Sequence, residues 1–216
     1  HLDATLRHSI RAELKEMRTH LGMTTIYATH NCLEAMSLGD RVAVLSEGRL
    51  LQLSTPDDIY LRPASTAVAK LFGDPEINLL DATLKSSGAS QLRLEMLGEN
   101  IPLPLPADVA QILTGMHTRR IKVGVRPADV RIVPAGDKQA FHAIIYSFEP
   151  LGTKSILTLK TVDGGLMRAL VDGHLAFETD RRTQFRIDPH LLVFFDAESQ
   201  MFLARSAEGS DEIFNG

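Results

Sequence analysis

The sequence predicts two regions of different fold class: an α/β region over residues 1–74 and an all-β, OB-like barrel over residues 75–216. The first region alternates segments of helical periodicity with short β-branched runs, which is typical of an α/β fold. Beyond Gly73-Asp74-Pro75 the apolar period becomes strand-like, and polar turns separate the short runs. That pattern favours a small barrel, so we place the domain boundary at this Gly-Asp-Pro step.

The first region is expected to begin with an amphipathic helix. Asp3 is a suitable N-cap, Gly22 is a suitable stop, and the segment between them has one apolar face. That face consists of Leu6, Ile10, Leu14, Met17 and Leu21. Residues 24–28 are rich in β-branched and aromatic side chains and predict a strand covered on both faces. His30 follows, so we expect its imidazole at the carboxyl end of a buried strand, where α/β sheets place their chemistry.

Three helix starts and one hairpin are predicted beyond His30. Each helix start has a side chain that can accept free backbone N–H groups: Asn31, Thr55 and Ser65. Glu47-Gly48 is a strong turn signal between strands at 41–46 and 49–53. In the helix after Asn31, the residues expected to point inward are Leu33, Met36 and Leu38.

The second region contains eight short strand candidates. They are residues 79–84, 91–96, 120–125, 141–148, 155–161, 166–171, 185–187 and 191–195. Turn signals such as residues 97–100 and 163–165 separate them, and one helix is predicted at 107–113. An OB-like barrel fits this number of strands.

The composition excludes several classes of function. Hydrophobic residues are 44% of the 216, but no apolar run approaches the length of a membrane span, so any membrane link must pass through a partner protein. The net charge is −4 and no Lys/Arg cluster is interleaved with aromatic residues, so nucleic acid is not an expected partner. Cys32 is the single cysteine, which excludes an internal disulfide and fits a reducing compartment. We expect it to be a small helix residue rather than a nucleophile.

A histidine at a strand end is more often structural than catalytic, and only the surrounding motifs favour a catalytic role for His30. These motifs are His1-Leu2-Asp3-Ala4, Leu6-Arg7, Thr29-His30 with Glu34-Ala35, Gly39-Asp40-Arg41-Val42, Gly48-Arg49, Thr55-Pro56, Ile59-Tyr60, Arg62-Pro63 and Asn78-Leu79-Leu80. In this order the series resembles the C-terminal part of ABC importer ATPases of the maltose and glycerol-phosphate type.

The second region resembles the TOBE-type regulatory domain of the same family. Gly124-Val125-Arg126-Pro127 and Leu151-Gly152 match two of its elements. Ala128 and Lys154 depart from the family's pattern, so no specific ligand contact is carried over. Arg126 is expected to be a structural arginine held against the barrel.

The resemblance implies which residues take part in nucleotide chemistry. His30 matches the family's switch histidine, which donates to the γ-phosphate, and Asp3 matches the D-loop aspartate, which acts across the nucleotide-binding dimer. Glu34 matches a helix glutamate, for which we expect a solvated position. ATP and Mg²⁺ are the implied cofactors of a longer parent protein. None is expected for this chain, because its sequence has no G-x-x-x-x-G-K-[ST] loop, signature loop or Walker B acidic pair.

The implied partners are a homodimer or second ATPase subunit, transmembrane permease subunits, and a regulatory protein or ligand at the TOBE domain. They imply a cytoplasmic protein that is peripheral on the inner face of the bacterial cell membrane. On this hypothesis the chain starts inside the D-loop of the ATP-hydrolysing subunit of an importer for a sugar, polyol or glycerol phosphate. The alternative is a self-standing regulatory or dimerisation module with a vestigial ATPase remnant.

Overall fold

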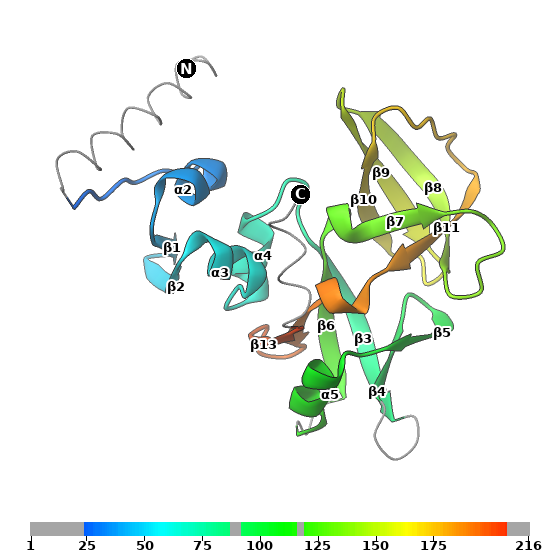
Figure 1. Cartoon of the computed structure of the whole chain (residues 1–216), viewed down its shortest axis with the longest axis horizontal. Helices are drawn as coiled ribbons and strands as arrows, with labels where there is room; N and C mark the ends of the chain where they lie inside the picture. The colour runs from blue at the N-terminus through cyan, green and yellow to red at the C-terminus, as the bar shows by residue number, and fades with distance from the viewer. Residues whose placement is uncertain (1–23, 87–91, 116–118, 207–216) are drawn as a thin grey trace.

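The computed structural model of the chain describes residues 24–86, 92–115 and 119–206 (Figure 1). We call the described residues up to Phe72 the first unit and those from Gly73 onward the β module. The first unit holds three short helices and a hairpin, and the β module is almost entirely antiparallel sheet. The helix predicted between Asp3 and Gly22 lies outside the described residues.

Hydrogen bonds to nearby side chains determine where the helices of the first unit begin. They are α2 (Cys32–Leu38), β1 (Val42–Ser46), β2 (Arg49–Ser54), α3 (Pro56–Leu61) and α4 (Thr66–Leu71). The three predicted N-caps are confirmed, since the side chains of Asn31, Thr55 and Ser65 each accept hydrogen bonds from backbone N–H groups of the helix that follows. The hairpin is also confirmed, with Glu47 and Gly48 both at positive φ, as a two-residue turn requires.

A small apolar core holds these elements together. Its buried members are Val42, Val44, Ile59, Val68 and Phe72, with Cys32, Ala35, Met36 and Leu51 packed partly against them. The expected inward position of Leu33 is wrong, because α2 turns its Cys32, Ala35 and Met36 side toward this core. The Leu33 side chain is accordingly 67% exposed.

The predicted strand over residues 24–28 is also wrong. This segment has no regular secondary structure and all five of its residues are exposed. A buried strand needs neighbours on both edges and both faces. The described residues provide none here, because β1 and β2 pair only with each other.

The β module consists of strands, one α-helix and two short 3₁₀ turns. The strands are β3 (Asn78–Ser86), β4 (Leu92–Met96), β5 (Glu99–Pro104), β6 (Arg120–Val125), β7 (Val130–Val133), β8 (Phe141–Pro150), β9 (Lys154–Thr161), β10 (Leu166–Asp172), β11 (Arg182–Ile187), β12 (Val193–Asp196) and β13 (Phe202–Arg205). The predicted helix at 107–113 is confirmed as α5 (Ala107–Thr114). The 3₁₀ turns are η1 (Pro127–Asp129) and η2 (Pro189–Leu191).

Two sheets enclose the main core of the β module. One has the strand order β10-β9-β8-β11-β7 and the other β13-β12-β6-β3-β4-β5. The terminal strands β10 and β7 of the first sheet lie against each other, so this sheet curls into a half-barrel (Figure 1). Inward-facing side chains of both sheets, such as Phe141, Phe185 and Phe194, fill the core. This mostly β architecture is consistent with the expected OB-like fold; the preceding α/β region is only weakly developed in the described residues.

Three strands were not predicted: β5, β7 and β13. β5 carries Pro102 and Pro104, which weaken a strand signal, and it is an edge strand, where proline is tolerated. β7 and β13 are only four residues each. The turn predicted at 97–100 is shorter than expected. Leu97 and Gly98 alone make it, both at positive φ, while the buried Leu97 side chain anchors it in the core.

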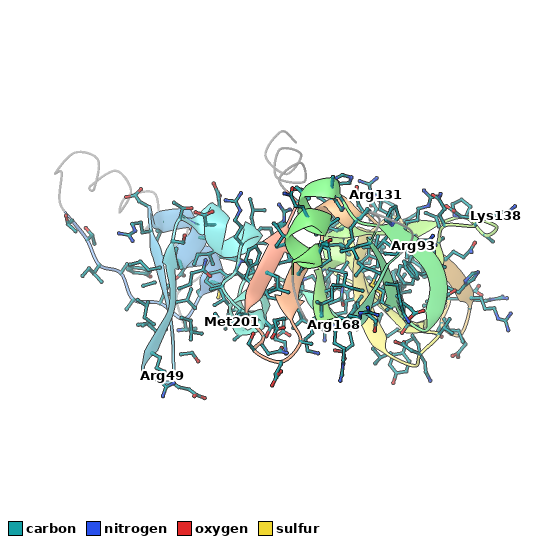
Figure 2. All side chains as sticks on the ribbon, turned by 90° about the horizontal axis from the view of Figure 1, so that it is seen from below. Arg49, Arg93, Arg131, Lys138, Arg168 and Met201 are labelled. Carbon is teal, nitrogen blue, oxygen red and sulfur yellow. The ribbon has the colours of Figure 1, made fainter. Side chains whose placement is uncertain are left out.

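Figure 2 shows how the two parts meet. Arg49 lies at the tip of the β1–β2 hairpin, far from the β module, whereas Met201 lies at the boundary between the two parts. No helix among the described residues is long and apolar enough to cross a membrane.

Candidate functional site

His30 lies in the turn that leads into α2, and it is exposed to solvent. It is therefore not at the end of a buried strand, as the sequence had suggested. Asp3 lies outside the described residues, so the structure does not relate these two candidate residues to each other.

The buried carboxylate of Glu34 organises the loop that carries His30. Glu34 is 9% exposed, and its Oε2 accepts hydrogen bonds from the hydroxyls of Thr29 (2.8 Å) and Tyr27 (3.2 Å). The expectation of a solvated helix acid is wrong, because the loop before α2 folds back over this side chain. Glu34 thus ties residues 27–29 to the first turn of the helix.

The residue after His30 is fixed equally well. The backbone N–H of Asn31 donates to Thr29 Oγ1 (3.0 Å), and Asn31 Oδ1 accepts from the backbone N–H groups of Leu33 (3.0 Å) and Glu34 (3.2 Å). Both neighbours of His30 are therefore held by hydrogen bonds while its imidazole faces solvent. An exposed imidazole on a loop held in this way can donate a hydrogen bond to an anionic group that approaches from outside the chain.

A second polar centre lies where the β module meets the first unit. Arg126, at the end of β6, is 6% exposed. Its Nη1 donates to the carbonyl of Phe72 (2.6 Å) and its Nη2 to the carbonyl of Tyr60, while its guanidinium carbon lies 3.5 Å from the centroid of the Tyr60 ring. Burial lowers the pKa of Arg126, while Tyr60 and Asp129 act in the opposite direction. The structural role expected for Arg126 is confirmed, but its side chain is held against the first unit rather than against the barrel.

The neighbouring Asp129 has a perturbed pKa. Burial raises its pKa from 3.8 to about 6, although the positive charges of Arg126 and Arg205 oppose that shift.

Gly124 precedes Arg126 by two residues, and a Cβ there would lie 2.8 Å from Ile77 Cδ1 and 3.2 Å from Phe195 Cε2. The Gly-Val-Arg-Pro element therefore combines a close packing position with a buried cation.

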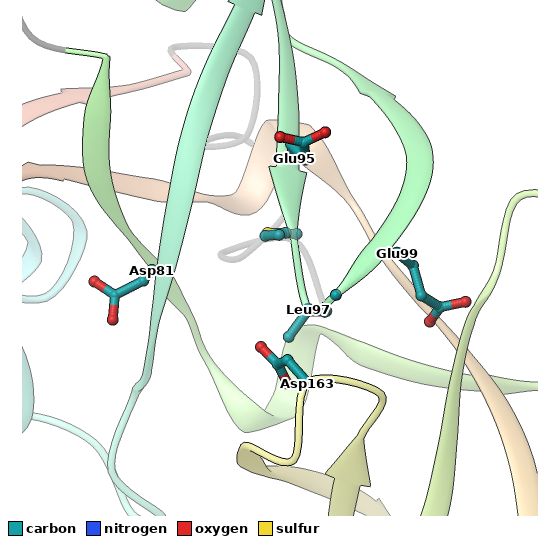
Figure 3. Close-up of a pocket in the computed structure, with 7 residues that line it drawn as sticks. Asp81, Glu95, Leu97, Glu99 and Asp163 are labelled. Carbon is teal, nitrogen blue, oxygen red and sulfur yellow. The ribbon is translucent and has the colours of Figure 1, made fainter.

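A cavity of about 400 Å³ lies between the β4–β5 turn and the β9–β10 turn (Figure 3). Three of its four acidic residues have a basic side chain beside them: Lys122 lies 2.8 Å from Asp81, Lys85 lies 3.4 Å from Glu95, and His142 Nδ1 lies 2.6 Å from Glu99. The fourth, Asp163, accepts hydrogen bonds from the hydroxyl of Thr161 and the backbone N–H of Gly165. The described residues contain no cluster of three or more side chains suited to a metal ion. Gly98 packs directly on Asp163, so the two turns close this end of the module.

The Leu151-Gly152 turn lies at the opposite end of β9. Gly152 adopts a positive φ, which favours glycine, and Leu151 is 63% exposed. The two departures from the family pattern, Ala128 and Lys154, are both exposed.

Comparison with known proteins accounts for both regions. The model of the MalK OB fold domain matches residues 73–130, and the model of the TOBE domain matches residues 123–195. The sn-glycerol-3-phosphate import ATP-binding protein UgpC of Chromobacterium violaceum is 35% identical over 206 residues, which is 95% of this chain and 53% of that protein. The chain belongs with the C-terminal part of the MalK-type ABC importer ATP-binding subunits.

Other MalK-type relatives extend this comparison. The xylose/arabinose import ATP-binding protein XacK of Haloferax volcanii is 35% identical over 92% of this chain and 50% of its own length. The trehalose/maltose import ATP-binding protein MalK of Thermococcus litoralis is 36% identical over 74% of this chain and 43% of its own length. This chain thus spans about half the length of the curated relatives it matches. A solved structure of the cytoplasmic molybdate-binding protein ModG gives a TM-score of 0.43 at 14% identity over 54% of this chain and 94% of that one, which is too weak to bear on function.

The sequence identified His30 and Arg126 as candidates but did not indicate the groups that contact Arg126 and the neighbours of His30. Glu34 was assigned to solvent, and the roles of Tyr27 and Thr29 were not foreseen. The available signal was the Thr-His-x-x-x-Glu spacing itself, because a residue before a helix can reach a carboxylate in its first turn. Nothing in the sequence pattern indicated that Arg126 reaches Tyr60, 66 positions earlier.

Proposed function

We propose that this chain is the C-terminal part of the ATP-hydrolysing subunit of an ABC importer, and that His30 is its catalytic contribution. The observation that carries the proposal is the relation to import ATP-binding proteins over 95% of the chain. The anchored, solvent-facing position of His30 supports the role of a donor to a group bound outside the described residues.

ATP with Mg²⁺ would supply the γ-phosphoryl group and part of its charge neutralisation. The sequence offers no phosphate loop, so other parts of the parent subunit would hold the phosphates. This chain would contribute the imidazole N–H of His30. On one side of His30 the loop is bound to Glu34 through Thr29, and on the other side Asn31 caps helix α2. Asp3 is proposed to act across the dimer of two such subunits.

His30 would act by electrostatic stabilisation. Negative charge on the transferring phosphoryl group is spread over its oxygens in the transition state, and a donor already in position there lowers the barrier without reorganising. The hydrogen bond from the Thr29 hydroxyl to Glu34 and the one from the backbone N–H of Asn31 to Thr29 reduce the motion of the backbone that carries the imidazole. The hydrogen bond from His30 would therefore raise the rate of turnover and leave the affinity for nucleotide in the ground state nearly unchanged.

The proposal extends to solute, partners and location. The relatives are named for import of glycerol phosphate, of xylose and arabinose, and of trehalose and maltose, so we propose a sugar, polyol or glycerol phosphate as the solute. The partners would be a second ATPase subunit, transmembrane permease subunits, and a regulatory protein or ligand at the TOBE domain. The working location would be the cytoplasmic face of the membrane.

MgATP turnover, measured side by side for this chain alone and for a longer parent that carries a phosphate loop, tests the proposal. We expect the parent to hydrolyse ATP and the chain alone to show no turnover above background, because tight phosphate binding needs the backbone donors and lysine of that loop. A parent that folds and binds its partners but lacks ATPase activity would instead favour the alternative, a regulatory or dimerisation module with a vestigial remnant. Turnover by the chain alone would contradict both.

A further inference from the structure

Helix α4 belongs to two cores at once. Val68 and Phe72 are buried in the core of the first unit, together with β1 and α3. Ala69, on another face of the same short helix, is buried against Ile77, Val193 and other residues of the β module. A rigid helix shared by two packed cores transmits displacement between them, because close-packed interiors yield little.

The amino end of α4 is joined to the turn between β12 and β13. The backbone N–H of Thr66 donates to the carbonyl of Gln200 (2.9 Å), and the Thr66 hydroxyl donates to Gln200 Oε1 (3.0 Å). The backbone N–H of Phe202 donates to the carbonyl of Ala64 (3.0 Å). The chain before α4 is thus paired with the β module as a strand would be.

The carboxyl ends of α3 and α4 are held by one side chain. Arg126 donates to the carbonyls of Tyr60 and Phe72, which belong to the last turn of α3 and the C-cap of α4. We call Arg126 with these two carbonyls the latch. A guanidinium can bridge two carbonyls and stack on a ring at the same time, which a lysine ammonium cannot do. Gly73 leaves room for it, since a Cβ there would lie 3.0 Å from Nη1.

The contacts continue from α4 to the loop of His30. Cys32, Ala35 and Met36 of α2 pack against the core that contains Val68 and Phe72 of α4. The first turn of α2 contains Glu34, which holds the residues before His30. A series of contacts therefore runs from the β module through α4 and α2 to Thr29, the residue before His30.

We propose that the latch makes the first unit and the β module one cooperative body, so that a loss of packing at their junction reaches the His30 loop through α4. The mechanical boundary between the two parts is then not at the Gly-Asp-Pro step. This inference concerns the chain's own mechanics and does not rest on ATP hydrolysis, so it can fail or succeed independently of the proposed function.

Hydrogen exchange of backbone amides in the purified chain tests the latch. In Arg126→Met, the carbonyls of Tyr60 and Phe72 lose their buried donor while the side-chain volume is largely kept. We expect amides of β1, β2 and α4 to exchange about tenfold faster or more, and amides of β8 and β9 to change less than about twofold. Arg126→Lys should lie between Arg126→Met and the unchanged chain. Arg186→Met is the matched control, because Arg186 pairs with Asp137 on the module surface.

Gly73→Ala provides a milder test if Arg126→Met does not fold, because the added methyl group displaces the guanidinium without removing it. We expect the same selective loss of protection in the first unit, with a smaller size. Equal loss of protection in the first unit and in β8 and β9 would make Arg126 a general stabiliser and overturn the proposal. Unchanged exchange in the first unit of a folded variant would overturn it as well.

Discussion

The hydroxyl of Thr29 donates a 2.8 Å hydrogen bond to the buried carboxylate of Glu34, across His30 and the N-cap of α2. This contact fixes the loop before α2 to the first turn of the helix. It also gives Glu34 a function that does not involve the nucleotide, namely to hold the residues on the amino side of His30.

Replacement of Glu34 tests that relationship. In Glu34→Ala, the hydroxyls of Thr29 and Tyr27 lose their acceptor, so we expect the free energy of unfolding to fall by about 1–3 kcal/mol. Amide exchange at residues 29–31 should accelerate as well. Urea unfolding and hydrogen exchange measure the two effects, with Glu76→Ala at an exposed position as control. Equal behaviour of the two variants would remove the organising role from Glu34.

Close packing at Gly124 makes a second prediction. An alanine Cβ there would lie 2.8 Å from Ile77 Cδ1 and 3.2 Å from the ring of the fully buried Phe195. Overpacking of this kind costs about 1–3 kcal/mol, so Gly124→Ala should unfold at a lower urea concentration. Gly115→Ala is the control, because its Cβ would meet its nearest neighbour, Ile112 O, at 3.6 Å. A Gly124→Ala protein as stable as the control would show that the junction can relax.

The pKa of Asp129 predicts a dependence of stability on pH with an unusual sign. Its pKa is about 6 in the folded chain and near 3.8 when unfolded, so the folded state binds the proton more tightly. The stabilisation from this group is therefore present below about pH 4 and is lost as pH rises through 6. The difference amounts to about 2 kcal/mol between pH 4 and pH 7.

Asp129→Asn removes that titration. Urea unfolding of both proteins at pH 4 and pH 7 should show that the original chain loses more stability than the variant on going to pH 7. Asp196→Asn is the control with the opposite sign, because hydrogen bonds from the backbone and hydroxyl of Ser199 lower the pKa of Asp196. Parallel pH profiles for the Asp129→Asn variant and the original chain would contradict the raised pKa.

Exposed apolar side chains on the first unit predict self-association. Ile26 is 95% exposed, and Leu45 and Leu50 on the hairpin are 68% and 56% exposed. Within the described residues the hairpin forms a sheet of only two strands, so its outer edges are unpaired as well. Light scattering should show mass above that of a monomer, and Leu45→Lys with Leu50→Lys should lower it. Leu151→Lys, on the β module, is the control; a strict monomer at all concentrations would contradict the prediction.

Local signals in the sequence predicted the short elements well. The capping residues Asn31, Thr55 and Ser65 identify helix starts because each needs only its own side chain and the next few N–H groups. The Glu47-Gly48 turn is equally local. Most strands of the β module were also found, since alternation along one strand reports which face is buried.

Features that depend on distant partners were not predictable. The segment 24–28 has the composition of a buried strand, but a strand forms only where neighbouring strands pair with it. The burial of Glu34 depends on how the preceding loop folds back, and the contacts of Arg126 join residues 54 and 66 positions apart. The same reason explains why the contacts of α4 with both parts could not be predicted.

We propose that His30 acts on the γ-phosphate in the complete subunit. In a longer parent that carries the phosphate loop, His30→Ala should leave ATP affinity nearly unchanged and lower turnover by roughly a hundredfold or more, as expected for the loss of one preorganised transition-state donor. His174→Ala, an exposed histidine of the β module, is the control, and melting temperatures check that both variants are folded. Near-normal ATP turnover in a well-folded His30→Ala parent would contradict the claim.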